Sequence, residues 1–212
     1  MSRGRLLMTN IVAFIVVLAL IAGGAYYYVQ NNNYVTTDNA KVSGDLHTIT
    51  APADGKLSGF NLEEGKKVAK DDELGKVSGA EKSMSVKTPA DGTIIKKQAS
   101  NDQMVQAGQT LASEVNMDSL YVLANIKEDE LNDIEEGDQV DVTVDGDDDT
   151  TLEGSVEKIG YATNSLFSLM PKSNDDGNYT KVTQTVPVKI SITNSSNKVL
   201  PGMNAEVKIS KN

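Results

Sequence analysis

The hydrophobic positions of this chain form one long continuous run, followed by short stretches in which apolar and polar residues alternate. Residues 6–29 are almost entirely apolar, and a helix over this run would measure about 36 Å at about 1.5 Å per residue. A bilayer core is about 30 Å thick, so residues 1–29 are predicted to be a cytoplasmic stub and a transmembrane anchor. Arg3 and Arg5 before the run, with Tyr26, Tyr27 and Tyr28 at its end, predict a cytoplasmic amino end.

The same run is also compatible with a cleaved secretory signal. The small residues of the sequence Ala-Gly-Gly-Ala at positions 22–25 would suit a signal peptidase. The length of the run and its closing tyrosines favour a retained anchor. Under either interpretation, residues 30–212 lie outside the cytoplasm.

Beyond the run, one segment of the chain repeats itself. The sequence Pro-Ala-Asp-Gly at positions 52–55 recurs at positions 89–92, and the 37-residue offset continues through the apolar positions that follow. Neither half could bury its apolar face alone, so the two halves are predicted to pack together as one β module over residues 48–116. Proline presets φ and glycine accepts positive φ, so a turn is expected at each copy, carried by Pro52, Gly55, Pro89 and Gly92.

The flanking segments predict further β structure. Residues 30–47 are expected to form a polar tether and the start of an edge strand that runs over 40–50. Residues 117–212 are predicted to form a small antiparallel β-barrel of four or five strands, with one short helix over 127–136. The expected fold class is therefore mainly β. The strands of the barrel are expected over 120–126, 140–144, 152–159, 182–192 and 200–209.

Composition narrows the range of functions. The chain has no cysteine, which excludes disulfides and cysteine-based metal sites. It carries 20 basic and 30 acidic residues, and only Arg3 and Arg5 fall within the first 29, so the rest has a net charge of −12. An acidic body repels nucleic acid and anionic lipid, so neither is expected as its partner.

Three stretches outside the repeat carry a resemblance to a known family. They are Tyr-Val-Thr-Thr-Asp-Asn-Ala at 34–40, the run over 167–190, and Leu-Pro-Gly-Met at 200–203. With an anchor before the repeat and a barrel after it, the chain resembles the HlyD-like membrane fusion (adaptor) family, in its EmrA-like branch. The repeat itself resembles the biotinyl/lipoyl-like β-sandwich.

This resemblance implies a function without catalysis or cofactor. A membrane-anchored adaptor of this kind would assist a polytopic transporter, of the major facilitator multidrug efflux type, at the outer face of the membrane, and would form a homo-oligomer. Long members insert an α-helical hairpin between the lipoyl halves, where this chain has only residues 78–85. The missing hairpin suggests a bacterium with a single membrane. Thr185 stands where relatives commonly place arginine.

Candidate chemistry in the body is sparse. Lys82 lies between the two halves, where carrier domains attach biotin or lipoate. A carrier domain modified on Lys82 is therefore an alternative function. Against it, an exported domain would not meet the cytoplasmic ligase that attaches the cofactor.

His47 has no nucleophile near it in the sequence and is expected to be an ordinary surface or packed side chain. No catalytic or metal-binding residue is predicted. Asp145, Asp147 and Asp149 resemble the start of a calcium loop, but Thr150 and Val156 stand where glycine and glutamate are required.

The long connection over 160–181 is the most unusual part of the barrel sequence. It places four large apolar side chains in what should be a polar loop. These four residues are Leu166, Phe167, Leu169 and Met170. They would either fold back to cap the barrel or form an apolar contact with a transporter or a neighbouring subunit.

A stand-alone cell-surface binding module is a third possible function of the chain.

Overall fold

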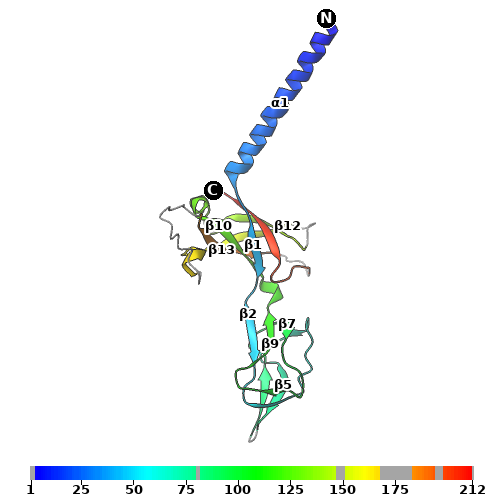
Figure 1. The fold of residues 1–212 in the computed structure, drawn as a ribbon, viewed down its shortest axis with the longest axis vertical. Coiled ribbons are helices and arrows are strands. Elements are labelled where there is room, and N and C mark those ends of the chain that lie inside the picture. Colours follow the sequence, from blue (N-terminus) through cyan, green and yellow to red (C-terminus); the bar gives the residue numbers. More distant parts are fainter. Residues whose placement is uncertain (1–2, 80–81, 147–150, 168–182, 194–197, 212) are drawn as a thin grey trace, which may run out of the picture. The chain divides into compact units, whose positions relative to one another are not determined.

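The computed structural model describes residues 3–79, 82–146, 151–167, 183–193 and 198–211. The chain begins with helix α1 (Arg3–Asn33), which runs directly into strand β1 (Tyr34–Ser43; Figure 1). It then divides into two compact units. One comprises Lys41–Val122 and Asn194–Asn204, and the other comprises the remaining residues.

Helix α1 exposes an apolar surface. Every side chain over residues 11–25 is exposed, including those of Phe14, Leu18 and Ile21. Across the residues that the structure describes, no helix has both the length and the apolar character that crossing a membrane requires. The transmembrane anchor therefore stays a prediction.

A β-sandwich of two four-stranded sheets occupies the first unit, as the repeat predicts. Strand β3 of the first half pairs with β8 of the second, and β4 of the first half pairs with β7 of the second. Each half therefore completes a sheet of the other, and both halves share one core around Phe60 and Leu111. The sheets are, in order, β2 (Leu46–Thr50), β9 (Thr110–Val115), β7 (Gly92–Lys97) and β4 (Lys67–Val68); and β6 (Ser83–Lys87), β5 (Glu73–Ser78), β3 (Gly55–Ser58) and β8 (Met104–Val105).

The two Pro-Ala-Asp-Gly turns hold the halves together by matching hydrogen bonds. Asp54 Oδ1 accepts from the backbone N–H of Ala107 at 2.7 Å, and Asp91 Oδ1 accepts from that of Lys70 at 2.8 Å. Donors and acceptors both differ by the 37-residue offset, so each aspartate caps the turn that the other half supplies. The glycine of the first turn is required by space, since a Cβ there would lie 2.3 Å from the carbonyl oxygen of residue 78.

We expect Asp54→Ala and Asp91→Ala to weaken the sandwich equally, by about 1 kcal/mol each, because each removes one hydrogen bond to a carboxylate. Hydrogen exchange of sandwich amides in the full chain measures the loss as a lower free energy of opening. Asp→Asn at either position keeps the acceptor oxygen and is the matched control. A loss at only one of the two positions would show that the turns are not equivalent.

The other unit contains a closed six-stranded barrel. The alternating valines of β11 point inward and meet the inward residues of β14 in register, as with Val142 opposite Val207. A mainly β fold with a sandwich and a barrel is thus confirmed. The barrel order is β1, β10 (Tyr121–Lys127), β13 (Thr185–Ile192), β12 (Thr151–Ile159), β11 (Gln139–Val144) and β14 (Asn204–Ser210). In the described part of the chain, three 3-10 helices connect elements: η1 (Met117–Ser119), η2 (Glu128–Asp133) and η3 (Asn164–Phe167).

Two elements differ from the sequence prediction. Residues 34–43, expected as tether and edge strand, form barrel strand β1. Its buried residues Val35 and Ala40 are an odd number of positions apart, which breaks the alternation that reveals a strand. The helix expected over 127–136 is the shorter 3-10 helix η2. Leu131 of η2 and Ile134, the residue that follows this helix, are three positions apart, and that spacing suits three residues per turn.

Candidate functional site

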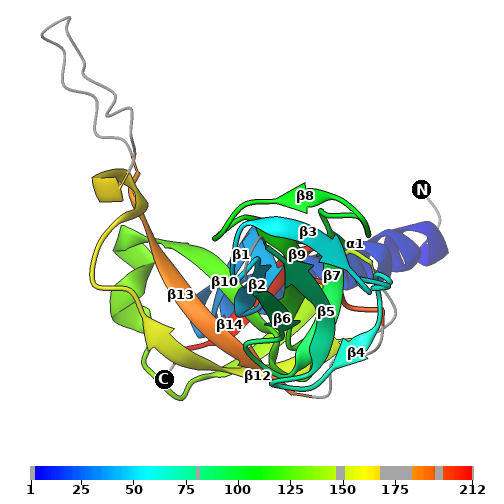
Figure 2. The same cartoon turned by 90° about the horizontal axis from the view of Figure 1, so that it is seen from below.

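Among the described residues of the barrel unit, the most exposed apolar side chains lie in the segment that leads into η3 and in η3 itself. Tyr161 is 91% exposed and Leu166 is 71% exposed. Helix η3, the short yellow helix in Figure 2, lies beside β13. Lys158 Nζ lies 5.4 Å from the centre of the Tyr161 ring, which leaves the ring exposed but partnered by a cation. We call Tyr161 and Leu166 the η3 surface.

A network of side-chain amides fixes the η3 surface to the barrel wall. Asn164 Nδ2 donates to Asn125 Oδ1 at 2.7 Å and to Thr185 Oγ1 at 3.0 Å. Asn125 Nδ2 in turn donates to Asn39 Oδ1 at 3.1 Å. The network therefore links η3 to β13, β10 and β1. These bonds join the start of η3, two residues before Leu166, to the barrel wall.

The sequence did not reveal this network. Asn125 and Asn164 carry no signal in the sequence, because an asparagine in a strand or a loop has no distinctive spacing. Asn39 belongs to the stretch at 34–40, but nothing in that stretch indicates its bonding partner. Thr185, noted as a departure from the arginine of relatives, serves here as an acceptor for Asn164.

Of the four predicted apolar contact residues, Leu166 has a described side chain, and it is exposed. Its role in a contact stays a prediction. The side chain of Phe167, and Leu169 and Met170 altogether, lie outside the described residues.

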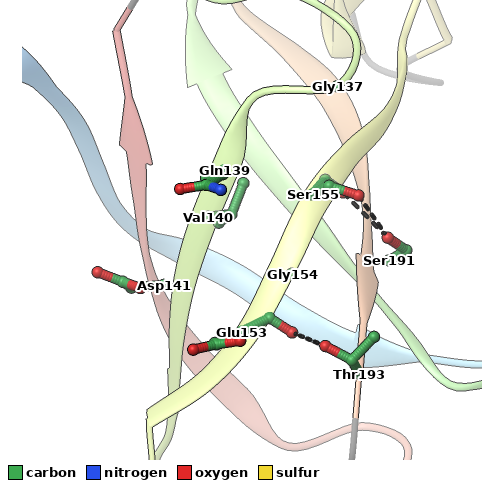
Figure 3. A pocket seen from close by; sticks show the side chains of 9 residues that line it. All are labelled: Gly137, Gln139, Val140, Asp141, Glu153, Gly154, Ser155, Ser191 and Thr193. Atoms are coloured by element: carbon green, nitrogen blue, oxygen red, sulfur yellow. Dashed lines mark hydrogen bonds between the residues drawn. The ribbon is translucent and has the colours of Figure 1, made fainter.

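A shallow groove crosses the outer face of β11, β12 and β13 (Figure 3). Its volume is about 420 Å³. Its hydroxyl groups are bound within the wall: Ser155 Oγ lies 2.9 Å from Ser191 Oγ, and Thr193 Oγ1 donates to the carbonyl oxygen of Glu153 at 2.7 Å. A small-molecule site is usually concave and mostly apolar, which this groove is not. The groove is lined by Gly137, Gln139, Val140, Asp141, Glu153, Gly154, Ser155, Ser191 and Thr193.

The other candidate residues are dispersed. Lys82 is exposed just before β6, and its carbonyl oxygen accepts from the N–H of Gly79 at 3.1 Å. His47 is half-buried on β2. Of the predicted calcium-loop residues, Asp145 is exposed, and Asp147 and Asp149 lie outside the described residues. Within the described residues, no three acidic, histidine or cysteine side chains are close enough together to hold a metal ion.

Two family descriptions match successive parts of the chain. "YhbJ, barrel-sandwich hybrid domain" matches residues 45–116, and "YknX-like beta-barrel domain" matches residues 120–209. These matches cover the repeat module and most of the following strands.

Individual proteins are similar over larger spans. The "Putative efflux system component YhbJ" of Bacillus subtilis is 62% identical over 211 residues, which is all of this chain and 95% of that protein. The "Probable multidrug resistance protein EmrK" of Escherichia coli is 33% identical over 112 residues, and this stretch is 52% of the chain but only 29% of EmrK. The solved structure of the "periplasmic adaptor protein EmrA" has the same fold, with a TM-score of 0.57 at 14% identity over 85% of this chain and 99% of that one.

Proposed function

The chain belongs to the membrane fusion protein (efflux adaptor) family, whose members are non-enzymatic and membrane-associated, and from this premise we propose that it is the anchored adaptor subunit of an export system. The observation that carries the proposal is the 62% identity to an efflux system component along the whole chain. The absence of catalytic chemistry expected from the sequence agrees with this family.

We propose that α1 is the membrane anchor. The support is the uniformly exposed apolar surface over residues 11–25, with Arg3 and Arg5 at the start of the helix. Water would meet this surface at a high free-energy cost, about 25 cal/mol per Å² of apolar area. The amino end would be cytoplasmic and the body extracytoplasmic.

The partner in this proposal is a polytopic transporter of the major facilitator multidrug efflux type. Its support is the similarity to EmrK, whose name is that of a multidrug resistance protein. The adaptor would act as a homo-oligomer over the outer mouth of the transporter. The sandwich (residues 48–116) and the barrel (117–212) would be its two modules.

We also propose that the cell has a single membrane. The similar efflux component comes from Bacillus subtilis, and only residues 79–82 lie between β5 and β6. Without a long hairpin at this position, the adaptor would not reach an outer channel.

The proposed contact with the transporter is the η3 surface, continued by Phe167, Leu169 and Met170. Its support is the exposure of Tyr161 and Leu166 on a segment that the amide network fixes. An exposed apolar surface on a fixed support is typical of a protein contact.

Deleting the gene tests the proposed function. We expect cells without the chain to accumulate a substrate of the partner transporter, and re-expression of the chain to restore its export. The transport rate of a fluorescent substrate is the measurement, with the transporter level checked by immunoblot. Unchanged export of every substrate of that transporter in the deletion strain would contradict the proposal.

A further inference from the structure

Asn125 of β10 lies at the centre of the amide network that joins η3 to the barrel strands. Its side chain uses both of its polar atoms: Oδ1 accepts from Asn164 Nδ2 at 2.7 Å, and Nδ2 donates to Asn39 Oδ1 at 3.1 Å. A side-chain amide offers an acceptor and two donors in one plane. Asn125 therefore binds η3 on one side and β1 on the other.

The β1 side of Asn125 is held by a closed ring of hydrogen bonds. Thr37 Oγ1 donates to the carbonyl oxygen of Asn125 at 3.2 Å, and the backbone N–H of Asn39 donates to Thr37 Oγ1 at 3.1 Å. The bond from Asn125 Nδ2 to Asn39 Oδ1 completes the ring. Because the ring already orders the Asn125 side chain, its bond to η3 costs less side-chain entropy than a bond from a free surface amide would.

Asn164 is the residue through which the network reaches η3. It is the first residue of this four-residue helix, and its Nδ2 donates to both Asn125 Oδ1 and Thr185 Oγ1. A further hydrogen bond stays within the segment, since the N–H of Leu166 donates to the carbonyl oxygen of Thr163 at 3.1 Å. A 3-10 helix this short has little stability of its own, so its position depends on what its side chains bind.

We propose that Asn125 is a positioning residue for the η3 surface, and that its side-chain amide fixes η3, with the exposed Leu166, relative to β1. Strand β1 directly follows α1, so the η3 surface is held on the strand into which the proposed anchor leads. A contact that is fixed before binding avoids the entropy cost of ordering it during binding. The use of this position by a transporter rests on the proposed function, whereas the positioning itself does not.

Two substitutions at Asn125 separate hydrogen bonding from side-chain shape. Asn125→Leu keeps the branching at Cγ but can neither accept from Asn164 nor donate to Asn39. Asn125→Asp keeps an acceptor for Asn164, and its second oxygen accepts from Asn39 once the amide of Asn39 turns over. Ser155→Ala is the matched control, because it removes the 2.9 Å hydrogen bond to Ser191 on the outer wall of the same barrel.

Distances between spin labels on the full chain in mild detergent test the positioning without any transporter. The chain has no cysteine, so Leu166→Cys on η3 and Glu206→Cys on β14 can carry the labels, and both native side chains are exposed. We expect Asn125→Leu to shift and broaden the distribution of distances between these two labels. Asn125→Asp and Ser155→Ala should leave it unchanged.

A second labelled pair, Thr36→Cys on β1 and Glu153→Cys on β12, reports on the barrel wall. Both native side chains are exposed, and the two strands are three apart in the barrel order. We expect the same distribution for this pair in every variant. An unchanged 166–206 distribution in Asn125→Leu would overturn the proposal. Equal broadening of both pairs, or an Asn125→Asp chain as disturbed as Asn125→Leu, would overturn it too, because the bonds of Asn125 would then not be what positions η3.

The yield of transporter co-purified with the tagged full chain adds a functional readout. We expect Asn125→Leu to lower this yield roughly fivefold, the effect of losing about one net hydrogen bond. Asn125→Asp and Ser155→Ala should keep it. If Asn125→Leu broadens the distances to η3 while the transporter yield stays the same, the positioning role of Asn125 is supported and the contact proposed for the η3 surface is contradicted.

Discussion

Replacing residues 1–29 with a cleavable export signal is expected to release the body from the membrane and to abolish export. The body keeps its sandwich and its barrel, each with its own buried core, so it should remain folded. An anchor holds the body at a high effective concentration beside its partner, and losing it lowers occupancy by about a hundredfold or more. Cell fractionation and the rate of substrate export measure the two effects.

An unrelated single-span helix with a basic amino end is the matched control for this variant. It restores the tether without restoring any specific contact that α1 makes in the membrane. Recovery of export would show that α1 acts as a tether, and failure to recover would show that α1 also packs against the transporter. Full export by the released body would contradict the proposed anchored adaptor.

Leu166→Glu is expected to separate the chain from its transporter. The substitution places a carboxylate in a proposed apolar contact, and burying it unpaired would cost about 2 kcal/mol or more, roughly thirtyfold in affinity. The yield of transporter co-purified with the tagged full chain is the measurement. The variant should leave the fold unchanged, because Leu166 is exposed.

Met104→Glu is the control for this prediction. Met104 on β8 of the sandwich is also 71% exposed, so it tests the same change of chemistry at another surface. Leu166→Met keeps the apolar character and should keep the partner. Equal loss of transporter in the Leu166→Glu and Met104→Glu variants would show that the η3 surface has no special role.

The sandwich was largely predictable from the sequence, because the repeated sequence indicates that it is built from two similar halves. The offset between the two Pro-Ala-Asp-Gly turns predicted that the halves share a core. The structure adds that Asp54 and Asp91 each bind the opposite half. The sequence shows both aspartates but not the backbone N–H groups that they bind. The donor to Asp54 is 53 residues away along the chain, and the donor to Asp91 is 21 residues away. Such pairing can be read only from the fold.

The barrel was less predictable, for reasons that lie in particular residues. Strand β1 is difficult to predict because it contains the polar sequence Thr-Thr-Asp-Asn, which is typical of a loop. In the barrel, these polar side chains face solvent and the amide network. The network itself joins residues 39, 125, 164 and 185, which no local pattern connects. The burial of Glu114 could not be predicted from the sequence, because a glutamate in a strand is expected to face solvent. The packed sheet shows that it faces inward.

Co-purification from mild detergent tests the central claim most directly, namely that this chain is an adaptor for a transporter. The tagged full chain is expressed from its own promoter, extracted under mild conditions, and its partners are identified by mass spectrometry. We predict a single polytopic membrane transporter, enriched over a control in which an unrelated anchored protein carries the tag. Recovery of the chain without any polytopic transporter, from cells that express their export systems, would contradict the account.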